Sequence, residues 1–288
     1  MSDQEFSIVI PAKNEAENLQ LLLPRLVGLF PQAEIIVVND GSSDSTESVC
    51  NENGVTVVSN SYSKGNGASI KAGARRASYD MVLFMDGDGQ HRPEDIPALF
   101  EKFEEGFDMV VGARSSNSQA SIFRLFANSF YNKLSSWISG QKIEDLTSGF
   151  RLVNKTMFLR FLNLLPNGFS YPTTITMAFF RAGYDVGYVP IETAKRLGKS
   201  HINFLKDGFR FIIIIFKIGT LYSPLKIFIP ISFVFFLTGL GYYCYTFITS
   251  HSFTNMSAVL FITSIIVFLI GLVSEQITVL MYMDNKND

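Results

Sequence analysis

The chain has few of the residues on which several protein classes depend. Its 288 residues include only two cysteines, Cys50 and Cys244, so a disulfide framework is not expected and a reducing compartment is indicated. Three scattered histidines, His91, His201 and His251, form no zinc-binding spacing with the cysteines. The 24 basic and 26 acidic residues leave a net charge of −2, which gives no indication of nucleic-acid binding.

Several sequence motifs are also missing. The N-terminal stretch MSDQEFSIVIPAKNE has no basic segment followed by an apolar one, so we expect no cleaved signal peptide. No G-x-x-x-x-G-K-[ST] sequence occurs, and the glycines of GNGASIKAG (65–73) have the wrong spacing for a dinucleotide fingerprint. These absences argue against a P-loop enzyme and against a dinucleotide-dependent one.

What the chain does have is a strongly apolar C-terminal part. The mean hydropathy of +0.22 is high for a purely soluble protein. Most of this hydrophobic character lies after residue 210. Residues 225–249 and 257–283 carry one charge each and are both long enough to cross a bilayer as a helix. The alternative is a pair of buried helices in a soluble core, although two such runs side by side are rare there.

The charges around the apolar runs predict their orientation. The linker 250–257 has no Lys or Arg, whereas Lys206, Arg210, Lys217 and Lys226 lie at or before the start of the first run. The positive-inside rule therefore places residues 1–224 and both termini in the cytoplasm. Residues 203–219 mix basic and apolar side chains, a pattern typical of a helix lying in the membrane interface.

The N-terminal part alternates short apolar runs with helical patterns. The expected strands are 6–12, 33–40, 55–60 and 79–86, and the expected helices are 15–30, 43–54 and 67–77. Pro24 is expected to kink or divide the first helix. Near-continuous apolar strands alternating with helices indicate an α/β fold with a mostly parallel sheet covered on both faces.

Polar clusters follow three of these strands. They are PAKNE after the first, NDGSSDST after the second and DGDGQ after the fourth. Because ligands in such sheets bind beyond the carboxyl ends of the strands, these clusters predict one binding site at a single edge.

The third cluster has the chemistry of a metal site. On an extended chain Asp86, Asp88 and Gln90 point to one side, and Gly87 lets backbone approach closely. Such oxygen ligands suit Mg²⁺ or Mn²⁺, which keep coordination positions for substrate phosphates. The alternative for D-x-D alone is a polar turn.

Together the motifs resemble a known family. IVIPAKNEAENL, IIVVNDGSSDST, GNGASIKAG and VLFMDGDGQHRPEDIP are similar to the nucleotide-sugar-binding half of a family 2 glycosyltransferase with the GT-A fold. Three later segments (112–134, 144–155 and 189–200) and the apolar hairpin narrow the resemblance to the polyprenyl-phosphate group, which includes dolichyl-phosphate mannose and glucose synthases. The resemblance covers essentially the whole chain.

The resemblance implies roles for individual residues. Pro11, Lys13, Glu15, Val38 and Asp40 would hold the base and ribose of the donor. Asp86, Gly87, Asp88 and Gln90 would hold the metal and the diphosphate. Arg114 would meet the donor phosphate, Arg124 the lipid phosphate, and Arg196 and Ser200 would close over the donor. Asp145 is a candidate catalytic residue, although Asp145 and Arg151 could equally hold the loop 140–155.

One departure from the family concerns the loop before the apolar segments. The family often has Lys where this chain has His201, which puts one phosphate contact in doubt, although Lys199 is close by in sequence.

The implied organisation is a catalytic domain at 1–200, a juxtamembrane helix at 201–224 and a two-span hairpin at 225–288. The implied activity is metal-dependent, inverting sugar transfer from a UDP- or GDP-sugar to a polyprenyl phosphate, in a bacterial inner membrane, with room for a tetramer. An alternative is a membrane glycosyltransferase acting on another lipid or on a polysaccharide, but the only Trp, Trp137, lies in no Q-x-x-R-W signature. Another is a non-catalytic adaptor, which would be expected to lack the metal ligands.

Overall fold

The computed structural model describes residues 5–114, 122–168, 170–193, 216 and 219–283. The chain divides into two compact units. We call Met1–Ser136 with Gln141–His201 the sheet unit, and Trp137–Gly140 with Ile202–Asp288 the hairpin unit.

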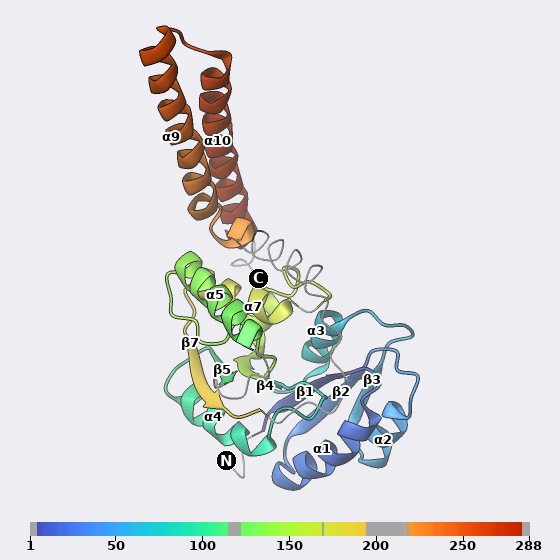
Figure 1. Cartoon of the computed structure of the whole chain (residues 1–288). Helices are drawn as coiled ribbons and strands as arrows, with labels where there is room; N and C mark the ends of the chain where they lie inside the picture. Colours follow the sequence, from blue (N-terminus) through green and yellow to red (C-terminus); the bar gives the residue numbers. More distant parts are fainter. Residues whose placement is uncertain (1–4, 115–121, 169, 194–215, 217–218, 284–288) are drawn as a thin grey trace. The chain divides into compact units, whose positions relative to one another are not determined.

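A seven-stranded sheet organises the sheet unit, in the order β3-β2-β1-β4-β6-β5-β7 (Figure 1). The strands are β1 (Ser7–Ala12), β2 (Glu34–Asn39), β3 (Thr56–Ser59), β4 (Met81–Phe84), β5 (Met109–Arg114), β6 (Arg151–Asn154) and β7 (Val186–Ile191). Only β6 runs antiparallel to its neighbours, so the expectation of a mostly parallel sheet is confirmed.

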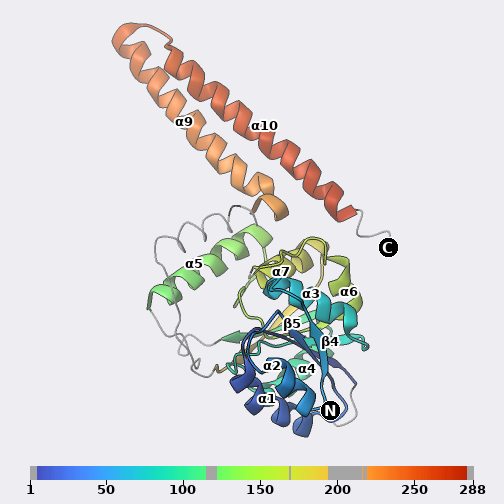
Figure 2. The same cartoon turned by 90° about the vertical axis from the view of Figure 1, so that its right-hand side faces the viewer.

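Helices cover both faces of this sheet (Figures 1 and 2). They are α1 (Ala16–Leu29), α2 (Thr46–Glu52), α3 (Asn66–Arg76), α4 (Ile96–Glu104), α6 (Lys155–Arg160) and α7 (Tyr171–Ala182), with a 3₁₀ turn at Pro93–Asp95. A further helix, α5 (Ile122–Ser139), contacts α7, where the hydroxyl of Tyr131 donates to Oγ1 of Thr173 at 3.2 Å. Apolar side chains of α1, α2 and α4 form one core with the strands. On the opposite face α3 packs on β1 and β2, and Phe158 of α6 contacts Phe84 of β4.

Of the two effects expected of Pro24, division of the first helix does not occur. The helix α1 runs through Pro24 without a break, with Leu19, Leu22, Leu23 and Leu26 buried on its inner face. Proline removes one backbone hydrogen bond from a helix interior. The burial of four leucines, each stabilising by roughly 1.5–3 kcal/mol, is enough to offset that loss.

The hairpin unit contains two long apolar helices, α9 (Pro224–Ser250) and α10 (Asn255–Met283). Their bounds agree with the two expected runs within two residues, and both helices are long and apolar enough to cross a membrane. Most of their large side chains are exposed on the outside of the pair. Glu275, the one charged residue of the second run, lies with Oε2 3.5 Å from the backbone nitrogen of Leu225, in the first turn of α9.

Two serines join the helices of the hairpin. The hydroxyl of Ser232 donates to the carbonyl oxygen of Ser264, and that of Ser264 donates to the carbonyl of Ser232, both at 2.9 Å. Both residues are more than nine-tenths buried. Close packing accompanies this pair, because a Cβ added to Gly271 would lie 2.7 Å from Cβ of Phe228. The hairpin is therefore held in one register.

Gly73 of α3 provides a test of the packing on the sheet. A Cβ at this position would lie 2.2 Å from Cγ1 of Val9, so Gly73→Ala should lower the free energy of unfolding by about 1–3 kcal/mol through overpacking. Gly28→Ala is the control, because Gly28 is also helical but has nothing within 4 Å, and it should stabilise the protein by about 0.4–1 kcal/mol. Thermal unfolding of the detergent-solubilised protein measures both, and an equal response of the two variants would contradict this packing.

Candidate active site

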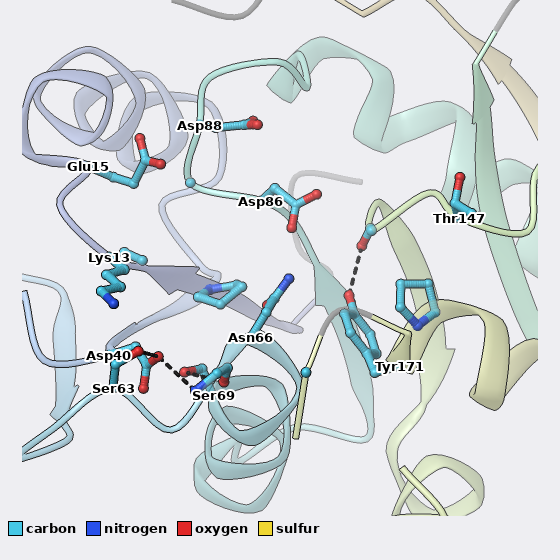
Figure 3. Close-up of a pocket in the computed structure, with 17 residues that line it drawn as sticks. Lys13, Glu15, Asp40, Ser63, Asn66, Ser69, Asp86, Asp88, Thr147 and Tyr171 are labelled. Carbon is cyan, nitrogen blue, oxygen red and sulfur yellow. Dashed lines mark hydrogen bonds between the residues drawn. The ribbon is translucent and has the colours of Figure 1, made fainter. Parts of the chain in front are cut away.

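A pocket of about 510 Å³ lies at the carboxyl ends of β1, β2 and β4 (Figure 3). Its lining residues are Pro11, Ala12, Lys13, Glu15, Asp40, Ser63, Gly65, Asn66, Ser69, Asp86, Gly87, Asp88, Thr147, Gly149, Gly168, Tyr171 and Pro172. The parallel pairing of β1 with β2 and β4 brings the three polar clusters to this edge. A pocket therefore lies at the edge of the sheet where the binding site is expected.

Asp86, which lines this pocket, lies close to two residues, His91 and Gly149. It follows β4, and its side chain is about one-third exposed. His91 is buried, stacks on Phe150 with the ring centroids 5.0 Å apart, and places Nε2 3.5 Å from Oδ2 of Asp86. On another side, a Cβ on Gly149 would lie 2.4 Å from the same oxygen. Only glycine at position 149 leaves room for the carboxylate.

The surrounding charges keep Asp86 ionised. Burial raises the pKa of the carboxyl, but a hydrogen bond from His91 and the electrostatic interactions with His91, Arg114 and Arg151 together lower it below its usual value. Asp86 therefore remains an anion at neutral pH and is available to bind a cation.

Asp40, which directly follows β2, accepts hydrogen bonds from four donors in the loop between β3 and α3. Its two oxygens accept hydrogen bonds of 2.8–2.9 Å from Asn60 Nδ2, Ser63 Oγ and the backbone nitrogens of Lys64 and Gly65. Burial raises the pKa of Asp40, but these four donors together lower it. Although it lines the pocket, its main visible contact is with the loop that leads into α3.

Arg114 and Asp145 form a pair next to the pocket. The guanidinium of Arg114 donates to both oxygens of Asp145, at 2.7 and 3.0 Å, and to Oγ1 of Thr147 at 2.6 Å. Burial raises the pKa of Asp145, but the hydrogen bond and charge of Arg114 outweigh that effect and lower it. The pair holds Thr147 in the pocket wall, while neither Arg114 nor Asp145 lines the pocket.

A buried arginine supports the wall opposite Asp40. Arg151 is fully buried and donates to the carbonyl oxygens of Ser148 and Pro172 and to Oγ1 of Thr176. It thus ties β6 to α7, which carries Tyr171 and Pro172. This arrangement favours the structural reading of Arg151.

The structure brings together seven of the residues that the resemblance implied. Pro11, Lys13, Glu15, Asp40, Asp86, Gly87 and Asp88 all line the pocket. Val38 is fully buried in β2, so its side chain does not reach the pocket. Arg124 lies on α5, but its side chain falls outside the described residues, as do Arg196 and Ser200.

Gln90 departs from the expected geometry. The chain after β4 is a turn with Gly89 at φ +72°, and the backbone nitrogen of Gln90 donates to Oδ1 of Asp88. The alternation of an extended chain, which would aim Asp86, Asp88 and Gln90 together, therefore does not extend to Gln90. Its side chain is not among the pocket-lining residues.

Sequence reasoning missed the α3 and α7 sides of the pocket. Ser63, Gly65, Asn66 and Ser69 lie around the start of α3, and Tyr171 and Pro172 begin α7. The GNGASIKAG motif contains Gly65, Asn66 and Ser69 but not Ser63, and it indicated these residues only as part of the resemblance. No sequence signal marked Tyr171, because its position depends on how α7 docks on β6.

The donor set of Asp86 and Asp88 fits Mg²⁺ or Mn²⁺. Both carboxylates face the same pocket in Figure 3, and carboxylate oxygens are the ligands these ions prefer. Among the described residues no group of three His, Cys, Asp or Glu side chains forms a self-sufficient metal site. The remaining ligands would therefore be water and substrate oxygens.

Gly149→Ala tests the close approach to Asp86. The added Cβ would displace the carboxylate, so we expect the affinity for Mn²⁺ to fall about 10–100-fold. Gly168→Ala is the matched control, because Gly168 also lines the pocket but has nothing within 4 Å. Titration of Mn²⁺ followed by electron paramagnetic resonance measures both, and unchanged binding by Gly149→Ala would contradict the crowding at Asp86.

The lowered pKa of Asp40 predicts that the free energy of unfolding falls at low pH. Its folded pKa is lower than its unfolded one, so its contribution is present above the unfolded pKa of about 4 and is lost as pH falls through the folded value. Asp40→Asn should cost about 1–3 kcal/mol at pH 7, and the difference from the original protein should narrow toward pH 2–3. Unfolding temperatures across this range measure it, with the exposed Asp80→Asn as control. A constant difference at all pH values would contradict the assignment.

Comparison with known proteins agrees with this geometry. Residues 7–162 match glycosyl transferase family 2, and residues 223–280 match the GtrB C-terminal hairpin. Polyprenol monophosphomannose synthase of Mycolicibacterium smegmatis is 30% identical over 69% of this chain and 82% of its own length. An undecaprenyl-phosphate 4-deoxy-4-formamido-L-arabinose transferase of Photorhabdus laumondii is 34% identical over 49% of this chain and 46% of its own length.

Solved structures share the fold. Glucosyl-3-phosphoglycerate synthase of Mycobacterium tuberculosis, crystallised with Mn²⁺, UDP-glucose and phosphoglyceric acid, superposes with a TM-score of 0.58 at 19% identity, over 74% of this chain and 79% of that one. The family match covers more than half of the chain and includes β1, β2 and β4 with their pocket residues. The chain belongs to glycosyl transferase family 2 and is a glycosyltransferase with a GT-A fold and a C-terminal apolar hairpin.

Proposed function

We propose that the chain transfers a sugar from a nucleotide-sugar donor to a polyprenyl phosphate at the cytoplasmic face of a membrane. The observation that carries this proposal is the presence, in one chain, of a carboxylate-bearing pocket and two helices able to span a bilayer. The donor is soluble in water and the acceptor is held in the bilayer, so the enzyme must meet both. The names of the Mycolicibacterium and Photorhabdus relatives support a polyprenyl phosphate as the acceptor.

We assign one role to each of three consecutive segments of the chain. Residues 1–200 would bind the donor, 201–224 would lie at the membrane surface, and 225–288 would cross the membrane twice. Lys13, Glu15 and Asp40 lie at one end of the pocket and would face the nucleoside. Tyr171 and Thr147 lie at the other end and would face the transferred sugar (Figure 3).

The acceptor requires little activation. The second pKa of a phosphate monoester is about 6, so the nucleophilic oxygen is already anionic at neutral pH and no strong general base is needed. This oxygen would attack the anomeric carbon, and the bond from that carbon to the donor diphosphate would break. A direct displacement of this kind inverts the configuration at the anomeric carbon. The nucleoside diphosphate leaves with the electron pair of the broken bond.

The main barrier to this reaction would be the electrostatic repulsion between the acceptor phosphate and the donor diphosphate. Arg124 would bind the acceptor phosphate, since arginine can grip phosphate with two donors. Asp86 and Asp88 would hold Mg²⁺ or Mn²⁺, which supplies positive charge to the departing diphosphate when bound. Arg114, fixed by Asp145, would add positive potential at the edge of the pocket.

Two substitutions test the site. Asp88→Asn removes one anionic ligand and Arg124→Ala removes the expected acceptor contact, so each should lower turnover by at least about 100-fold. Asp80→Asn, an exposed carboxylate before β4, and Lys133→Ala, an exposed cation on α5, are the matched controls. Release of nucleoside diphosphate and unfolding temperature would be measured together. Retained activity in both site variants would refute the residue assignment.

A donor screen tests the reaction itself. Full-length protein with Mn²⁺ or Mg²⁺ and a polyprenyl phosphate should release nucleoside diphosphate from one or a few members of a panel of UDP- and GDP-sugars. The lipid product should carry the sugar with inverted configuration. Binding of a donor without release would favour the adaptor alternative. Release that needs a polysaccharide or another lipid would favour the alternative acceptors.

A further inference from the structure

The last turn of α5 is capped by a lysine side chain from α9. The final carbonyl groups of an α-helix lack partners within the helix. In the hairpin unit, Nζ of Lys226 donates to the carbonyl oxygens of Trp137 and Ile138, at 3.2 and 2.9 Å. A cation at a helix C-terminus also interacts favourably with the helix dipole. Lys226 thus holds the end of α5.

The capping lysine is also part of the membrane hairpin. Lys226 lies in the first turn of α9, which starts at Pro224. A lysine at the end of a spanning helix normally extends toward lipid phosphates. Here its ammonium group is directed at two backbone carbonyls instead. The contact therefore places Trp137 at the level where α9 begins.

Trp137 is a large, mainly apolar side chain that is exposed at the end of α5. Its side chain is 51% exposed, whereas the adjacent Ile138 is 2% exposed. It is also the only tryptophan of the chain. Phe216, another aromatic residue of the hairpin unit, is 47% exposed and packs edge to face against Phe228 of α9. Aromatic side chains gather at the boundary between lipid and water, and tryptophan does so most strongly together with tyrosine.

We propose that Trp137 lies in the headgroup layer of the bilayer and that Lys226, by capping α5, holds it there. The occupant of this exposed surface is the phospholipid bilayer that the hairpin crosses, because the contact is continuous with the first turn of α9. This inference rests on the proposed membrane placement of the hairpin. It assigns to the end of α5 the role of a membrane anchor in addition to the hairpin.

The single tryptophan makes the proposal directly measurable. The full-length protein is reconstituted into phosphatidylcholine and phosphatidylglycerol vesicles that contain lipids with a quencher either near the headgroup or deep in the acyl chain. Trp137 fluorescence should be quenched at least about twofold more by the shallow quencher than by the deep one. It should also be protected from iodide in the water. Equal or absent lipid quenching, or full access to iodide, would overturn the proposal.

Two variants calibrate the depth. In a Trp137→Phe background, Phe233→Trp places the probe on an exposed position of α9, about 14 Å along the helix from Pro224, where the deep quencher should dominate. In the same background, Tyr62→Trp places it on an exposed position of the sheet unit, where iodide should dominate. If the Phe233→Trp probe escapes lipid quenching, the membrane placement fails. If the Phe233→Trp probe is quenched by lipid but Trp137 is not, the membrane placement holds and only the proposed position of Trp137 is wrong.

Lys226→Met tests the cap separately. The substitution keeps an apolar stem but removes the donors to Trp137 and Ile138. Shallow quenching of Trp137 should fall and its emission should shift to longer wavelength, while quenching of Phe233→Trp in the Trp137→Phe, Lys226→Met background should not change. An unchanged Trp137 signal in Lys226→Met would show that the cap does not position this residue.

Discussion

Parallel pairing of β1 with β2 on one side and β4 on the other determines where the chemistry of this chain takes place. Parallel strands end at the same edge, so the residues that follow them must share that edge. Asp40, Asp86 and the segment from Pro11 to Glu15 come together for this reason. The other elements then support the edge: α3 and α7 form the remaining pocket walls, and Arg151 ties α7 to the sheet.

The carboxylates of this site differ in what they contact. Asp40 accepts four protein hydrogen bonds and holds a loop, while Asp145 is paired with Arg114 and holds Thr147. Oδ2 of Asp86 lies 3.5 Å from Nε2 of His91 and next to Gly149, and Asp88, which accepts a hydrogen bond from the backbone nitrogen of Gln90, lines the pocket. Asp40 and Asp145 thus mainly stabilise the protein structure around the pocket. Asp86 and Asp88, together with Glu15 and Asp40, line the pocket that a substrate would fill.

Strands and helices in the first part of the sheet unit, up to β4, could be predicted from the sequence because local pattern determines them. The apolar runs and their helical spacers correspond to β1–β4 and α1–α3 within a few residues. Errors arose where tertiary contacts decide. Burial of leucines keeps α1 continuous through Pro24, and a left-handed Gly89 turns the chain before Gln90. The positions of Tyr171 and Gly149 depend on packing between segments distant in sequence, which periodicity does not encode.

The reciprocal hydrogen bonds of Ser232 and Ser264 also affect how the hairpin can associate with its surroundings. Each hydroxyl is satisfied by the opposite helix, and the hydroxyls of Thr238 and Thr249 donate to carbonyls of their own helix. These four groups therefore need no polar partner in hydrocarbon, where an unsatisfied one would be costly. A second hairpin or a polyprenyl chain lying alongside would meet mainly aliphatic and aromatic side chains at these levels. Recognition within the bilayer would then depend on the fit of apolar shapes rather than on hydrogen bonding.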